Sequence, residues 1–144
     1  MVAATGRCLC GAVSVHIVPD MDELRACHCD MCRRWSGSAF LSIHVPDGSL
    51  TSDGPVRTYK SSDWAERAWC ELCGSSLWYR LCTPGREFYG VAAGLFDKAC
   101  GFALAKEFYI DRKPDGFAFA GEHKRLSEAR MNEIIAAFVA RGET

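Results

Sequence analysis

The first four-fifths of the chain are typical of short strands between turns, and two segments alternate apolar and polar residues with the two-residue period of β-strands. In residues 11–18, Val13, Val15 and Ile17 share one face and polar side chains occupy the other, which is typical of a half-buried strand. Residues 38–45 repeat the pattern, and Pro- and Gly-containing turns separate such segments. We predict strands at residues 11–18, 24–27, 38–45, 56–60, 67–70, 76–81, 87–92 and 107–110.

The C-terminal segment has a helical period instead. Its apolar residues recur three and four positions apart: Met131, Ile134, Ile135, Phe138 and Val139. Ser127 can cap the start of a helix, and Arg141 with Gly142 suits its end. The pattern therefore predicts a helix at about 127–141 whose apolar stripe packs on the rest of the protein. We find no repeat or linker, so residues 1–144 are expected to form one mainly β domain with a C-terminal α-helix.

Composition and charge exclude several classes of protein. Of the 144 residues, 49% are hydrophobic and 24% are charged, which is ordinary globular usage and excludes disorder. Seventeen basic residues face eighteen acidic ones, and this balance disfavours a nucleic-acid-binding protein. No apolar run is long enough to span a membrane, and the first residues do not resemble a secretory signal. We therefore expect a cytoplasmic protein without a membrane or nucleic-acid partner.

Cysteine is the residue type that departs from ordinary composition, with nine in the chain. The number is odd, and a cytoplasmic protein keeps its thiols reduced, so metal binding is favoured over disulfides. Seven cysteines form three groups, C-x-C, C-x-C-x-x-C and C-x-x-C-G: Cys8 and Cys10; Cys27, Cys29 and Cys32; and Cys70 and Cys73. Short spacings of this kind bring two sulfurs to one metal ion, and the glycine allows the tight turn between them.

Seven ligands are one too few for two closed four-cysteine sites. They suffice for one closed site, which is typical of structural zinc, and for a three-cysteine site with an open position, which chemistry requires. The spacing alone also allows one site made of Cys29, Cys32, Cys70 and Cys73, a single structural zinc, or iron in a four-cysteine site. His28 lies between two cysteines, and in extended backbone its side chain points away from theirs, so we expect it to pack. Cys82 and Cys100 are isolated in the sequence, and we expect them to be buried thiols.

Several stretches resemble the glutathione-dependent formaldehyde-activating enzyme family over about residues 7–126. They read C-L-C-G-A-V at 8–13, C-H-C-D-M-C-R-R at 27–34, S-G at 36–37, W-C-E-L-C-G-S-S-L at 69–77, G-L-F-D at 94–97 and K-P-D-G-F at 113–117. Two positions depart from the family pattern: Glu107 stands where many members have His, and Gly116 where many have an aromatic residue.

The resemblance implies a β-tent of small antiparallel sheets pinned by zinc, with two zinc ions per chain. It assigns four cysteines to the structural zinc: Cys8, Cys10, Cys70 and Cys73. It assigns Cys27, Cys29 and Cys32 to a second, reactive and more labile zinc, and these three are the expected catalytic residues. The implied reaction is that of a carbon–sulfur lyase, in which glutathione and formaldehyde give S-hydroxymethylglutathione.

The residue chemistry fits this expectation. Zinc with three thiolates carries a formal charge of −1, and such a thiolate-rich centre suits a further sulfur ligand, here glutathione or another thiol that attacks a small aldehyde. Arg33 and Arg34 follow Cys32 directly and are candidates to bind a glutathione carboxylate. The Ser36 hydroxyl is a further candidate for substrate binding. The alternative function is a zinc-stabilised module that binds proteins without catalysis.

Overall fold

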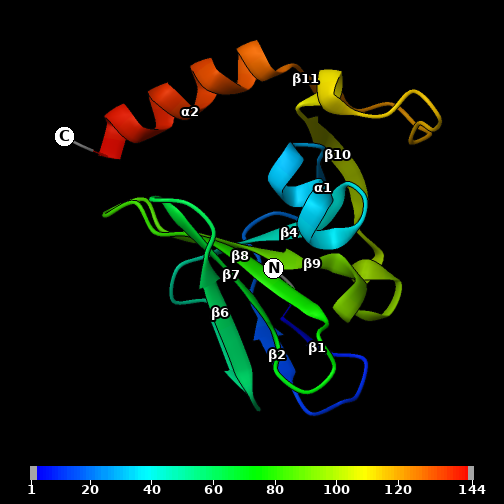
Figure 1. The fold of residues 1–144 in the computed structure, drawn as a ribbon, viewed down its shortest axis with the longest axis vertical. Helices are drawn as coiled ribbons and strands as arrows, with labels where there is room; N and C mark the ends of the chain where they lie inside the picture. The colour runs from blue at the N-terminus through cyan, green and yellow to red at the C-terminus, as the bar shows by residue number, and fades with distance from the viewer. Residues whose placement is uncertain (1–2, 143–144) are drawn as a thin grey trace.

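The computed structural model describes residues 3–142, which contain two β-sheets (Figure 1). The smaller sheet has the strand order β1-β2-β5, with both pairs antiparallel: β1 (Ala4–Arg7), β2 (Ser14–Ile17) and β5 (Leu50–Asp53). The larger sheet has the order β11-β10-β3-β4-β9-β8-β7-β6. Its strands are β3 (Glu23–Cys27), β4 (Phe40–Pro46), β6 (Val56–Lys60), β7 (Ala65–Cys70), β8 (Ser76–Leu81), β9 (Phe88–Ala92), β10 (Ala103–Phe108) and β11 (Lys124–Leu126).

Two α-helices accompany the sheets. They are α1 (Asp30–Ser36) and α2 (Glu128–Gly142), and the short 3-10 turns are η1 (Ala93–Leu95), η2 (Asp97–Gly101) and η3 (Ile110–Arg112). In Figure 1, α1 lies beside β10, and α2 runs across the same end of the molecule. Within the described residues, no helix is long and apolar enough to cross a membrane.

The predicted class, mainly β with a C-terminal helix, is confirmed. The helix begins where expected, since Ser127 Oγ accepts the backbone N–H of Arg130 at 3.2 Å. The sheets differ in detail from the small antiparallel ones that the resemblance implies. The second sheet has eight strands in the described residues, and β10 pairs in parallel with both β3 and β11.

Four short elements were not predicted: β1, β5, α1 and β11. The largest error in the predicted bounds concerns the strand expected at 107–110, which is β10 and runs from Ala103 to Phe108. The next residue, Tyr109, has a φ of 58°, in the left-handed region that extended strands do not use. The chain therefore turns away from the sheet directly after β10.

The core lies between the two sheets. Val13, Val15 and Ile17 are buried on one face, as the alternation predicts, and they belong to one cluster with Ile43 and Leu77 of the larger sheet. Cys8 and Cys70 are part of the same cluster, so sulfur atoms from both sheets lie at the edge of the core.

Candidate metal centres

The first cysteine group joins the two sheets. Cys8 and Cys10 lie in the loop between β1 and β2, while Cys70 ends β7 and Cys73 lies in the turn before β8. The four sulfurs lie within 4.8 Å of one another; the Sγ atoms of Cys8 and Cys10 are 3.6 Å apart, and those of Cys10 and Cys70 are 3.8 Å apart. A tetrahedron with Zn–S bonds of about 2.3 Å has edges of about 3.8 Å, so the spacing fits zinc.

A glycine shapes each turn of this group. Gly11 and Gly74 follow the second cysteine of each pair with φ of 80° and 78°, a conformation that side chains with a Cβ disfavour. Their backbone N–H groups donate to the carbonyls of Cys8 at 3.1 Å and Cys70 at 2.9 Å, which closes both turns. The predicted role of the glycine after C-x-x-C is confirmed.

Hydrogen bonds in the turns favour thiolate. The backbone N–H groups of Val13 and Cys73 point at the sulfurs of Cys8 and Cys70 at 3.3 and 3.5 Å. The hydroxyl and backbone N–H of Ser75 lower the pKa of Cys73 to about 5. The donors therefore favour thiolate at Cys8 and Cys73. At Cys10, desolvation and the three neighbouring sulfurs outweigh a backbone hydrogen bond from Ala12 and raise the pKa to about 11.

The second group contains Cys27, Cys29 and Cys32, whose sulfur atoms also lie within 4.8 Å of one another. Cys27 ends β3, Cys29 is the N-cap of α1, and Cys32 lies in the first turn of α1. Cys29 Sγ accepts the backbone N–H of Cys32 at 3.4 Å, as a capping side chain does. The structure thus brings together the two groups that the resemblance implied, and Cys29 and Cys32 do not join Cys70 and Cys73.

Three thiols so close together cannot all ionise without a positive charge nearby. Hydrogen bonds from Cys27 and Cys32 lower the pKa of Cys29 to about 2, and the hydrogen bond to Cys29 is the largest cause that raises the pKa of Cys27. One thiolate therefore forms at the expense of its neighbours. A divalent soft cation would allow all three thiolates, so the donor set fits zinc.

Arg67 supplies one positive charge to this group. Its Nη1 and Nη2 atoms donate to Cys32 Sγ at 3.6 and 3.7 Å, and its Nε donates to Ser61 Oγ at 3.3 Å. The guanidinium lies over the rings of Trp35 and Tyr79, at 5.0 and 5.2 Å from their centroids. Arg67 is buried, so its charge acts on the sulfurs with little screening by water.

Both cysteine groups lie within a stretch of the chain that matches the sequence model of a known family. The sequence model of the glutathione-dependent formaldehyde-activating enzyme family matches residues 3–112. The chain belongs to this family. It is 33% identical over 135 residues to an uncharacterized lyase of Schizosaccharomyces pombe, with 93% of this chain and 96% of that protein covered. Together these similarities support an enzyme of the lyase type.

A solved structure shares the fold. The crystal structure of a Rhodobacter sphaeroides protein matches with a TM-score of 0.56 at 20% identity, and the match covers 84% of this chain and 98% of that one. At this identity the likeness concerns the fold alone.

Within this family member, the candidate substrate-binding residues lie on α1. Arg33 and Arg34 both approach Asp30, with N–O distances of 3.1 and 3.8 Å, and 70% of the Arg34 side chain is exposed. Arg112 also pairs with Asp30, at 3.5 Å. The Ser36 hydroxyl lies 2.8 Å from the carbonyl oxygens of Cys32 and Ser38, so its proton is used within the end of the helix. Binding of substrate by Arg33, Arg34 and Ser36 stays a prediction.

The remaining cysteines and His28 lie outside both groups, as predicted. All nine cysteines fall within the described residues and are free, and Cys82 and Cys100 join neither group. Both are only partly buried, so the expectation that they are buried thiols was wrong. The His28 ring is buried and binds Glu107 rather than adding a ligand to the three sulfurs.

Two tyrosines beside the three-cysteine group were missed by the sequence reasoning. Burial, together with the nearby sulfurs of Cys27 and Cys29, raises the pKa of Tyr109 to about 12. Burial is also the main cause that raises the pKa of Tyr79. Both phenols therefore stay neutral near the sulfurs. No sequence motif marks them, although both lie on predicted strands.

Proposed function

We propose that this protein is a zinc-dependent carbon–sulfur lyase that adds the thiol of glutathione to formaldehyde, giving S-hydroxymethylglutathione or a related glutathione adduct. The observation that carries the proposal is the division of seven cysteines into a group of four and a separate group of three. Four sulfurs complete a tetrahedral zinc site, and three leave a position open for a substrate.

The four-cysteine group would hold the structural zinc, and Cys27, Cys29 and Cys32 would hold the reactive one. Zinc bound by three thiolates supplies a soft Lewis-acid centre at which an incoming thiol loses its proton. Arg67 offsets the negative charge that the three thiolates bring, and its hydrogen bonds to Cys32 fix one sulfur in place.

The proposed reaction balances without a redox partner. A bond forms between the glutathione sulfur and the formaldehyde carbon, the carbonyl π bond breaks, and the thiol proton ends on the new hydroxyl oxygen. Arg33 and Arg34 would bind a glutathione carboxylate by leaving Asp30, whose pairs with them are partly exposed and therefore weak. The nine free cysteines suit a reducing compartment such as the cytoplasm, where glutathione is abundant.

Metal analysis and kinetics test this proposal. We expect two zinc ions per chain and a rate of S-hydroxymethylglutathione formation, followed by exchange NMR, that rises with protein concentration. Cys29→Ser should remain folded, lose one zinc and lose the rate enhancement. The matched control is Cys82→Ser, because Cys82 is a half-buried thiol outside both groups.

Two outcomes would contradict the proposal. One is a wild-type protein that binds a single zinc while Cys27, Cys29 and Cys32 react freely with iodoacetamide. The other is a two-zinc protein without rate enhancement, which would favour the protein-binding module.

A further inference from the structure

Glu107 forms a buried bridge between two histidines. Its Oε1 accepts from His28 Nε2 at 2.7 Å, and its Oε2 accepts from His123 Nε2 at 2.5 Å. The side chains of all three residues are only 1% exposed. Because a carboxylate accepts at both oxygens, each histidine must present an N–H at Nε2, which fixes the orientation of both rings.

The surroundings keep this carboxylate charged. Burial raises the pKa of Glu107, but hydrogen bonds from His123 and His28 outweigh it and the net pKa is lowered. Arg125 Nε lies 3.3 Å from Oε2 and adds a positive charge. The His28 ring also lies near the rings of Phe117 and Phe119, at centroid distances of 6.3 and 6.0 Å.

The bridge is connected directly to the three-cysteine group. In the parallel pairing of β10 with β3, Glu107 lies opposite Ala26, and Phe108 lies opposite Cys27. The backbone N–H of His28 donates to the Phe108 carbonyl at 3.0 Å. Two adjacent residues of β10 therefore hold His28 by its ring and by its backbone, between two of the candidate metal ligands.

We propose that Glu107 is a positioning residue for the reactive metal centre: by holding His28, it fixes the backbone that carries Cys27 and Cys29. This inference rests on the proposed function, because it concerns the zinc of that centre. Through His123, the same carboxylate ties the segment before β11 to the cysteine loop. Residues that orient metal ligands without touching the metal commonly contribute 10–100-fold to metal affinity, so an effect of about that size is expected here.

The test measures the release of zinc from the wild-type protein and from Glu107→Gln to an excess of a chromophoric chelator. Wild-type protein should release two equivalents in two phases, the faster from the three-cysteine group. Glu107→Gln should accelerate the faster phase by roughly 10–100-fold and leave the slower phase unchanged. The four-cysteine zinc is thus an internal reference, because a general loss of stability would accelerate both phases together.

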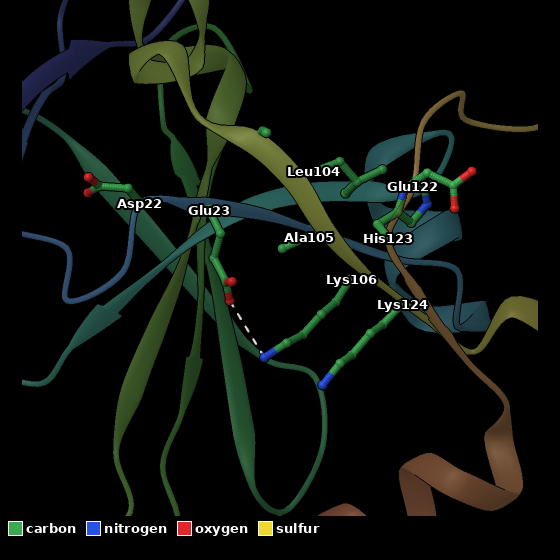
Figure 2. Close-up of a pocket in the computed structure, with 9 residues that line it drawn as sticks. Asp22, Glu23, Leu104, Ala105, Lys106, Glu122, His123 and Lys124 are labelled. Atoms are coloured by element: carbon green, nitrogen blue, oxygen red, sulfur yellow. Dashed lines mark ion pairs between the residues drawn. The ribbon is translucent and has the colours of Figure 1, made fainter.

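Glu23→Gln is the matched control. Glu23 is a partly buried carboxylate at the start of β3, paired with Lys106 at 3.6 Å and with Arg25 at 3.1 Å. Figure 2 shows this ion pair with Lys106 in an open depression whose lining also includes His123, although Glu23 itself pairs with Lys106 and Arg25 and not with the bridge. No cysteine lines that depression. Glu23→Gln removes a carboxylate from the same sheet without touching His28, and both phases should keep their wild-type rates.

A second variant covers the case in which Glu107→Gln does not fold. His123→Leu removes one side of the bridge and leaves the bond between Glu107 and His28, so it should accelerate the fast phase by a smaller factor. Wild-type rates in Glu107→Gln, or equal acceleration of both phases in the variant that folds, would overturn the proposal. A wild-type protein that releases a single equivalent would instead overturn the proposed function, so the two failures are distinguishable.

Discussion

At the scale of single residues, a buried cation and a cluster of sulfurs depend on each other. Arg67 is buried because Cys32, Ser61 and two aromatic rings replace its water. A buried guanidinium without such partners would be strongly unfavourable. In turn, three thiolates around a divalent cation leave a net negative charge that Arg67 offsets. Removing either partner leaves the other buried and uncompensated.

The Arg67→Met variant should therefore weaken the metal affinity of the three-cysteine group by about tenfold or more, while the four-cysteine zinc remains. The zinc affinity of the Arg67→Lys variant should lie between those of Arg67→Met and the wild type, because lysine keeps the charge and loses the forked donor geometry. Zinc content after dialysis against a buffered chelator measures the effect. Arg130→Met is the control, since Arg130 forms an exposed ion pair with Glu133 on α2, outside both cysteine groups. Equal zinc retention in all three variants would contradict this interpretation.

Sequence reasoning found the two groups of cysteines and missed the residues around them. Local spacing marks cysteines, because ligands of one metal often come in short pairs. Glu107 and His123 approach His28 only through the pairing of β10 with β3, which no local pattern reveals. Arg67 carried a usable signal: it lies two positions after buried Ala65 on β7, so the alternation places it facing inward.

At the scale of elements, the cysteine turns depend on backbone conformation more than on packing. Gly74 has a φ of 78°, and a Cβ added there would meet no atom within 4 Å. Gly74→Ala should therefore cost about 1–2 kcal/mol from the left-handed backbone alone. Gly116→Ala is the matched control, because that glycine is equally open and lacks a positive φ. Denaturant unfolding of the zinc-loaded proteins measures the free energy of unfolding of both variants. Equal values would refute the interpretation that Gly74 is required by its backbone conformation.

At this scale, the sequence predicted the elements whose residues carry a local pattern and missed those without one. The segments that became β2 and β4 were predicted from alternating apolar and polar residues, and those that became β7 and β8 from strand-favouring residues between turns. The helix α1 has seven residues, and its N-cap is a cysteine rather than a usual capping residue, so neither signal was present. The strand β5 is short and mostly exposed, and only its pairing with β2 defines it.

The helix α2 contacts the body of the protein at few points. Met131 is buried, and the ring centroids of Phe138 and Phe88 lie 6.1 Å apart. Arg86 Nε donates to the Phe138 carbonyl at 2.9 Å. Near its start, Glu128 accepts from Arg112 at 3.1 Å. The predicted packing of the stripe is thus partial, since 43% of Ile135 is exposed.

A chain ending at Leu126 should therefore keep both metal centres and lose stability. Exposing the apolar surface that Met131 and Phe138 bury should lower the free energy of unfolding by about 2–4 kcal/mol and the melting temperature by roughly 10 °C. Zinc content and a thermal melt of the zinc-loaded truncated protein test this expectation. A truncated protein with one zinc would show that α2 supports a metal centre.

At the scale of the whole molecule, the two cysteine groups differ in what they connect. The four-cysteine group joins the loop after β1, in the smaller sheet, to the turn between β7 and β8, in the larger one. The three-cysteine group lies where β3 of the larger sheet leads into α1. A metal ion in the first group would link the two sheets, whereas a metal ion in the second would lie beside a single sheet.

Removal of metal should therefore proceed in two stages with different consequences. Structural zinc in small peptides contributes about 10–16 kcal/mol, and whole domains are stable by about 5–15 kcal/mol, so loss of the four-cysteine zinc should unfold the protein. Loss of the other zinc should leave the β-sheet circular dichroism unchanged. A chelator titration should remove the first equivalent of zinc without a change in the circular dichroism spectrum, and removal of the second equivalent should coincide with unfolding. The Cys70→Ser protein should then be unfolded, and the Cys29→Ser protein should be folded. A folded Cys70→Ser protein without zinc would refute the structural assignment, because its two sheets would hold together without a shared metal.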